Sequence, residues 1–92
     1  MTIRWTPTAF SDLQSVHAYI AADNRAAAAT MVDQLLQAIN ALAKHPQMGR
    51  IGRVAGTREL IVRPYVIVYR GKGVVLELLA IIHGARKWPE SF

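Results

Sequence analysis

The residue types best suited to chemistry lie near the end of the sequence, where His83 is followed within four positions by Arg86 and Lys87. An imidazole beside two fixed cations can act as a general acid or base toward a phosphodiester, while the cations stabilise the developing charge. A structural alternative is that His83 hydrogen-bonds to backbone at the end of a strand and that both cations are solvated. Trp88, next in the chain, could cover the edge of a sheet or anchor a partner protein. The residue types are consistent with either interpretation.

Motifs of several other well-known sites do not occur in the sequence. There is no phosphate-binding glycine loop, HExxH pair, nucleophile elbow or cluster of Cys and His. Gly49, Gly52 and Gly56 neither follow a predicted strand nor open a predicted helix, which argues against a nucleotide-binding loop. His17 and His45 fall within or at the end of predicted helices and are expected to be structural. We therefore expect neither a cofactor nor a metal ion.

Positive charge is concentrated in the second half of the chain. The formal net charge is +5, and residues 45–92 contain eight Lys or Arg against three Asp or Glu, whereas residues 1–44 contain three of each. A basic surface of this kind suits a polyanion or an acidic protein, with an attraction that salt weakens. The alternative is a solvated basic face with no specific partner.

Two helices are predicted for the first half of the chain. Thr6 and Pro7 are typical of an N-cap followed by proline at the first helical position. Asp23 and Asn24 then end this first helix and can cap the second, which begins near Arg25. The two helices must be antiparallel, because so few residues join them.

Each predicted helix has an apolar stripe that would face a common core. The second helix ends before Pro46, because proline disfavours helical conformation in the residue that precedes it. Ser11, Asp12 and Gln14 are expected mostly on the solvent side of the first helix. The stripes comprise Ala9, Leu13, Val16 and Ile20 in the first helix and Val32, Leu35, Leu36, Ile39 and Leu42 in the second.

Strands account for most of the remaining sequence. Both alternating sets of side chains in the last strand are mainly apolar, which is typical of a central strand covered on both faces. The resulting order, β-α-α-β-β-β, predicts an α+β fold with a helical hairpin packed on a small, mainly antiparallel sheet. The expected segments are a strand over 2–6, an exposed loop over 46–56, and strands over 57–63, 65–70 and 74–83, with a turn at 71–73.

Length and composition predict one domain over residues 1–92. A chain of this size buries enough surface for a single core, and 52% of its residues are hydrophobic. It contains no cysteine, so stability must come from packing rather than disulfides. The N-terminus lacks the pattern of a secretory signal, and the apolar run 74–82 is far shorter than the roughly 20 residues of a membrane helix. We therefore expect a soluble cytoplasmic protein that does not enter membranes.

Five short motifs, taken in order, resemble the RelE/ParE superfamily of toxins on its ParE-like side. Together they extend over nearly the whole chain, and their order and spacing are more specific than any one of them. They are Thr6-Pro7-x-Ala9-x-x-Asp12-Leu13, His45-Pro46-x-x-Gly49-Arg50, Gly56-Thr57-Arg58-Glu59-Leu60, Pro64-Tyr65-Val66-Ile67-Val68-Tyr69-Arg70 and His83-Gly84-Ala85-Arg86-Lys87-Trp88-Pro89.

The resemblance implies the toxin half of a type II toxin–antitoxin system, with the same fold as the one derived from periodicity. Such a toxin inhibits growth until a cognate acidic antitoxin wraps it, and the basic second half offers that partner a surface. Family members differ in target, because ParE-like toxins poison DNA gyrase and RelE-like toxins cleave mRNA on the ribosome. A module that only binds its antitoxin is a third possibility.

One departure from the family pattern concerns the target. In the RNA-cleaving members an arginine typically follows the residue that opens the third strand, and here Val66 follows Tyr65 in that place. Valine cannot hold a phosphate, so a non-enzymatic gyrase inhibitor is favoured over an endonuclease. The endonuclease would use Arg58, Arg63, His83 and Arg86 as its catalytic residues. The residues expected to contact the target or the antitoxin are Arg58, Arg63, Arg70, His83, Arg86, Lys87 and Trp88.

Overall fold

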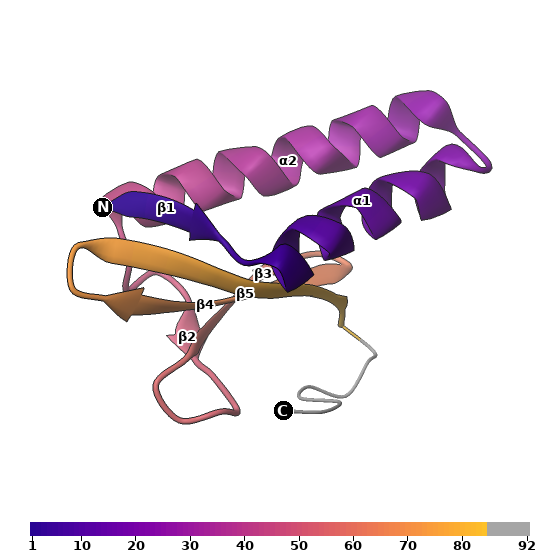
Figure 1. Ribbon diagram of the computed structural model, residues 1–92. Helices are drawn as coiled ribbons and strands as arrows, with labels where there is room; N and C mark the ends of the chain where they lie inside the picture. Colours follow the sequence, from indigo (N-terminus) through magenta and orange to yellow (C-terminus); the bar gives the residue numbers. More distant parts are fainter. Residues whose placement is uncertain (85–92) are drawn as a thin grey trace.

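Two helices lie on one face of a five-stranded sheet in the computed structural model of the chain, which describes residues 1–84 (Figure 1). The elements are β1 (Thr2–Trp5), α1 (Pro7–Ala21), α2 (Arg25–Lys44), β2 (Arg50–Ile51), β3 (Arg58–Val62), β4 (Tyr65–Lys72) and β5 (Val75–His83). The α+β class and the helical hairpin on a sheet are confirmed. β2 is an additional short strand inside the segment predicted as an exposed loop. The expected contact residues Arg86, Lys87 and Trp88 lie outside the described residues.

Both helices begin at the predicted capping residues. The Thr6 hydroxyl accepts the N–H of Ala9 at 3.1 Å with Pro7 at the first helical position, and Asn24 Oδ1 accepts the N–H of Ala27 at 3.0 Å. The same Thr6 hydroxyl donates to the carbonyl of Leu78 at 2.7 Å, which ties the start of α1 to β5. Neither helix, nor any other in residues 1–84, is long and apolar enough to cross a membrane.

The strands are arranged in the order β1-β5-β4-β3-β2. β1 pairs with β5 in parallel, and the other neighbouring strands are antiparallel, so the sheet is mainly antiparallel as predicted. β5 lies between β1 and β4, and most of its residues are buried, which confirms it as a central strand. The register of β4 and β5 shifts at Val68 and Tyr69, where a bulge changes which β5 residues oppose β4.

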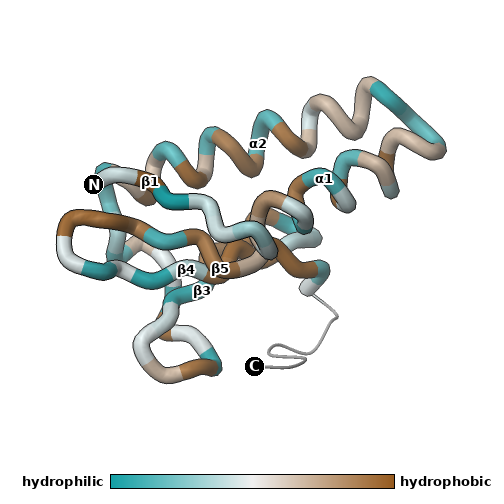
Figure 2. The backbone as a smooth tube through the Cα atoms, viewed as in Figure 1, coloured by the Kyte–Doolittle hydropathy of each residue, from teal (hydrophilic) through white to brown (hydrophobic). Residues whose placement is uncertain are grey.

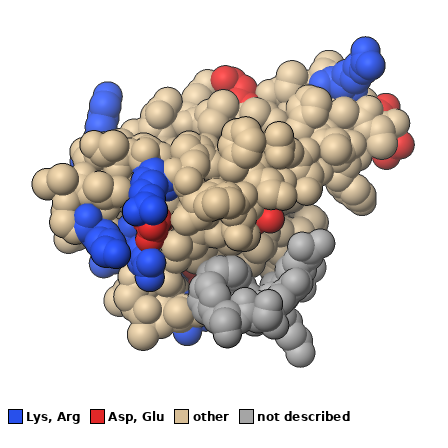
Figure 3. Space-filling model, in the orientation of Figure 1, with Lys and Arg blue, Asp and Glu red and all other residues tan. Residues whose placement is uncertain are grey.

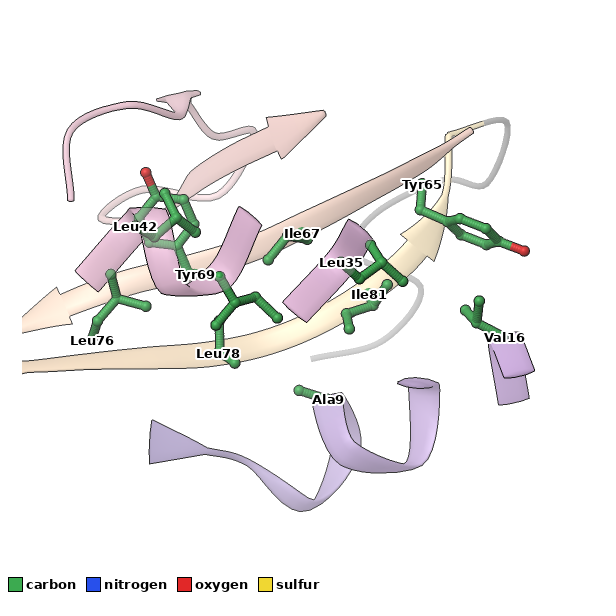
Figure 4. Packing of buried hydrophobic residues seen from close by; sticks show 11 residues of the cluster. Ala9, Val16, Leu35, Leu42, Tyr65, Ile67, Tyr69, Leu76, Leu78 and Ile81 are labelled. Atoms are coloured by element: carbon green, nitrogen blue, oxygen red, sulfur yellow. The ribbon is translucent and has the colours of Figure 1, made fainter. Parts of the chain in front are cut away.

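The main core lies between the helices and the sheet. Figure 2 shows hydrophobic residues recurring on the side of α2 that faces the strands, and in Figure 4 side chains of both helices point toward those of β4 and β5. The prediction for Leu36 is wrong, because that side chain is 38% exposed beside the stripe rather than within it. The buried members of this core are Ala9, Val16, Leu35, Ile39, Leu42, Tyr65, Ile67, Tyr69, Leu76, Leu78 and Ile81.

A second, smaller cluster lies on the opposite face of the sheet. Successive strand residues point to opposite faces, so the neighbours of core residues in β4 and β5 belong to this side. Its buried members are Val66, Val68, Ala80 and Ile82, with Leu79 packed against them. Both faces of the central strands therefore carry buried apolar side chains.

The segment between α2 and β3 is held by buried polar groups, so its description as an exposed loop is incomplete. The Tyr69 hydroxyl accepts the N–H of Gly49 at 2.9 Å and donates to the carbonyl of Pro46 at 2.8 Å. Gly49 is itself buried, and a Cβ there would lie 2.6 Å from the Tyr69 oxygen. The position therefore requires glycine because the tyrosine approaches so closely.

Glu59 is the second anchor of this segment and is only 1% exposed. Its carboxylate accepts from the Arg50 guanidinium at 2.9 Å, and from both the backbone N–H and the guanidinium of Arg53 at 3.0 Å and 3.2 Å. Burial alone raises the pKa of Glu59, but the hydrogen bonds from Arg53 and Arg50 outweigh it and lower the pKa to about 2. The carboxylate therefore stays ionised and fixes β2 against β3.

Candidate functional site

A cleft of about 500 Å³ opens between α1 and the adjoining ends of β4 and β5. The helical residues that line it recur at intervals of three and four positions, so they share one side of α1. His83 closes the strand side, which places this predicted contact residue in a cleft rather than on a flat surface. The lining residues are Asp12, Ser15, Val16, Tyr19, Tyr65, Ile81 and His83.

Asp12 lies deeper in this cleft than the sequence indicated. Its Oδ2 accepts the backbone N–H of Ile81 at 3.0 Å, and the residue is half-buried, so its placement on the solvent side of the helix is wrong. The physical reason lies in β1, whose pairing with β5 ends at Leu78. Beyond that point the N–H of Ile81 needs another acceptor, and Asp12 supplies it. This contact joins residues 69 positions apart, so local periodicity could not reveal it.

His83 stands directly opposite Tyr65 in the β4–β5 register. The two rings meet edge to face, with centroids 5.7 Å apart and planes at 81°. Tyr65 is 6% exposed, whereas His83 and Tyr19 are exposed at the rim. The cleft therefore offers an imidazole, a carboxylate and aromatic walls, which suit polar and aromatic side chains of a partner.

A second cleft, of about 400 Å³, also has Tyr65 in its lining, but it includes Val66 from the face of the sheet turned away from the helices. Arg63 lines it in the turn between β3 and β4, so Arg63 and His83 lie at the same end of the sheet. The lining residues are Arg50, Ile61, Arg63, Pro64, Tyr65, Val66 and Gly84.

The other predicted arginines are held elsewhere. Arg58 lies opposite Tyr69 and donates to the carbonyl of Gly49 at 2.8 Å, so it supports the loop. Arg70 donates to Glu77 at 2.7 Å and is five residues along β4 from Tyr65, about 17 Å for an extended strand. The fold thus places Arg63 and His83 at the same end of the sheet but leaves Arg58 and Arg70 toward the far end of the strands.

Val66 is 4% exposed and belongs to the apolar cluster on the sheet face away from the helices. The position at which RNA-cleaving members are expected to carry an arginine is therefore a packing position here. Within residues 1–84, no three His, Cys, Asp or Glu side chains come together in a way that could hold a metal ion.

Comparison with known proteins agrees with the fold and with the resemblance. Residues 3–88 match the family described as the ParE toxin of the type II toxin–antitoxin system parDE. A putative toxin of Sinorhizobium fredii, Y4kP, is 42% identical over 90 residues, covering 96% of this chain and 93% of the relative. Toxin RelE2 of Caulobacter vibrioides is 33% identical over 82 residues, covering 89% of this chain and 93% of the relative.

A solved structure, the chromosomal ParDE system from P. aeruginosa, superposes with a TM-score of 0.79 at 25% identity, covering 90% of this chain and 95% of that one. Fold and relatives together define a class of protein, the toxins of type II toxin–antitoxin systems, whose partner is an antitoxin. Within that class, the chain belongs to the ParE toxin family.

Proposed function

We propose that the chain inhibits DNA gyrase by binding it, without catalysing a reaction of its own, and that an acidic antitoxin releases the inhibition. Residues 1–92 act as one toxin domain in this proposal, in the cytoplasm, where gyrase works. Family membership supports the toxin and its antitoxin partner. The choice of binding over catalysis rests on one structural observation, the dispersal of the predicted catalytic arginines. Gyrase is the target that the resemblance to ParE-like toxins implies.

A phosphodiester-cleaving site needs an acid–base group and charge-stabilising groups within hydrogen-bond reach of the same atoms. The Arg58 guanidinium donates to the Gly49 carbonyl, and Val66 is packed in an apolar cluster. Neither side chain can therefore stabilise charge on a phosphodiester at His83. A binding site has no such requirement. The two clefts that have Tyr65 in their linings instead offer aromatic and arginine side chains, which dominate protein interfaces.

The second candidate is a ribosome-dependent mRNA endonuclease. It is supported by the position of His83 and Arg63 at the same end of the sheet, and by the relative named Toxin RelE2. The catalytic residues predicted for this endonuclease also include Arg86, which lies outside the described residues.

Two assays with the purified chain distinguish these functions. In the first, the chain is added to gyrase and relaxed plasmid, and supercoiling is measured. In the second, it is added to ribosomes programmed with a defined mRNA, and cleavage is mapped. Inhibition of supercoiling with intact mRNA is the expected result. Cleaved mRNA with normal supercoiling would contradict the proposal, and inactivity in both assays would indicate a module that only binds its antitoxin.

His83→Ala and Arg63→Ala test how the site works. If these residues are contacts, each substitution weakens gyrase inhibition by no more than about 10-fold, because a single contact at an interface rim contributes modestly. A catalytic group would instead account for about 10²-fold or more of the rate. Arg25→Ala is the matched control, because Arg25 is an exposed cation at the start of α2, away from both clefts.

A further inference from the structure

The sheet face turned away from the helices carries a group of basic side chains at the end remote from His83. Ile3, Trp5, Leu76, Leu78 and Tyr69 all belong to the core on the helix side. Residues adjacent to these in the strands therefore point to the opposite face. Arg4, Glu77 and Arg70 are in such positions, and Arg4 and Arg70 both pair with Glu77 in the strand register. Lys72 is two residues beyond Arg70 in β4 and therefore points to the same face.

A nearly buried carboxylate holds these cations in place. Glu77 is 6% exposed and accepts from Arg70 Nε at 2.7 Å, with an Arg4 guanidinium nitrogen 3.7 Å away. The Arg70 and Arg4 side chains are themselves 46% and 67% exposed. Each guanidinium is thus oriented by Glu77 on one side and presents its remaining N–H groups to solvent.

The same arrangement recurs across the sheet at Glu59, which is opposite Val68 and therefore on this face. Arg50 and Arg53 pair with it, with side chains 55% and 43% exposed. The basic face, defined as Arg4, Arg50, Arg53, Arg70 and Lys72, thus extends from β1 to the segment around β2. That is about 19 Å, since neighbouring strands are about 4.8 Å apart. In Figure 3 blue side chains surround a red one over β1, β4 and β5.

The make-up of this face indicates the class of ligand. A protein partner would need an apolar or aromatic anchor, and single-stranded nucleic acid would need aromatic rings on which bases stack. The aromatic strand residues Trp5, Tyr65 and Tyr69 all pack on the helix side instead. Phosphate contacts to a duplex need only cations placed along a surface.

We propose that the basic face binds the phosphate backbone of double-stranded nucleic acid without reading its sequence. This function goes beyond the proposed inhibition of a target and does not depend on the identity of that target, although Arg50 of the basic face also lines the second cleft. The two buried glutamates act as positioning residues that hold the guanidinium groups toward the phosphates.

Fluorescence anisotropy with the full chain tests this proposal, using labelled duplex DNA, duplex RNA and single-stranded RNA of about 20 nucleotides at a series of salt concentrations. The informative variant is Arg4→Gln with Lys72→Gln, because both cations are exposed and Arg70 still pairs with Glu77. Arg25→Gln with Lys44→Gln is the control, since it removes the same charge from α2. Circular dichroism and thermal unfolding check that both variants fold.

The expected result is that the parent and the control variant bind duplex, and that the Arg4 and Lys72 variant binds about 10-fold or more weakly at low salt. Its slope of log affinity against log salt should decrease by nearly two, because each phosphate contact contributes about 0.9. Comparison of the affinities for duplex DNA and duplex RNA then identifies which nucleic acid supplies the phosphate backbone. The proposal would be overturned by an equal loss of duplex affinity in both variants. Tighter binding to single-stranded RNA, or to an acidic peptide competitor, than to duplex would also overturn it.

Discussion

Glu59 illustrates how much a single residue can contribute in a protein of this size. Its pKa is lowered from 4.5 to about 2 in the folded chain, so the ionised side chain stabilises the fold above about pH 4.5. That contribution is lost as the pH falls from 4.5 toward 2, because the unfolded chain then binds the proton first. A shift of this size corresponds to at most about 3 kcal/mol.

We therefore expect Glu59→Gln to lower the free energy of unfolding by up to about 3 kcal/mol at pH 7, and by half of that or less near pH 3. Urea denaturation at the two pH values measures the difference. Asp33→Asn is the control, because the Asp33 carboxylate is exposed on α2 and its hydrogen bond from Gln37 is at the surface. An equal loss at both pH values would show that Glu59 acts through packing rather than charge.

At the scale of elements, α2 owes its position to a narrow apolar stripe. Leu35 is fully buried against the sheet, whereas its neighbour Leu36 is 38% exposed, although both are leucines in one helix. Truncation of a buried leucine leaves a cavity, and truncation of an exposed one removes few contacts.

We predict that Leu35→Ala lowers the free energy of unfolding by roughly 2–5 kcal/mol, and that Leu36→Ala lowers it by less than about 1 kcal/mol. Chemical denaturation of both variants provides the measurement, with each serving as the control for the other because the change in helix propensity is the same. Similar losses of unfolding free energy for the two variants would mean that the apolar stripe of α2 is rotated from its assigned position.

At the scale of the whole molecule, the encounter with a charged partner depends more on where the positive charges lie than on their total. Most cations belong to the second half of the sequence, but the fold adds Arg4 to the group on β4 and leaves Arg25 at the far end of the helical hairpin. An acidic antitoxin should therefore approach a strongly asymmetric molecule.

We expect association with the antitoxin to slow about 10-fold between low and high salt while dissociation changes little, because charges at an interface rim act mainly on encounter. Stopped-flow mixing of the two purified proteins yields both rate constants. The dissociation rate constant is the internal control. An association rate constant that is insensitive to salt would assign the basic side chains to a partner other than the antitoxin.

Much of the fold could be predicted from the sequence, because the determinants were local. Thr6, Pro7 and Asn24 mark the helix starts through hydrogen bonds within one turn, and Pro46 ends α2 through its effect on the preceding residue. The double apolar alternation of β5 predicted its central position, since a strand covered on both faces cannot alternate with polar residues. His83 and Arg63 were likewise recognisable as candidates by residue type.

The tertiary structure alone decided which of these residues meet. Asp12 reaches Ile81 only because β1 ends before β5 does, and Arg58 is drawn to Gly49 by the loop that Tyr69 and Glu59 hold. The basic face joins Arg4 to Arg70, 66 positions later, through the parallel pairing of β1 with β5. Sequence patterns report the periodicity of one element, whereas these contacts depend on how separate elements register against each other. The sequence therefore determined both helices, the four longer strands and the toxin class, and the packing of the sheet determined β2, the clefts and the basic face.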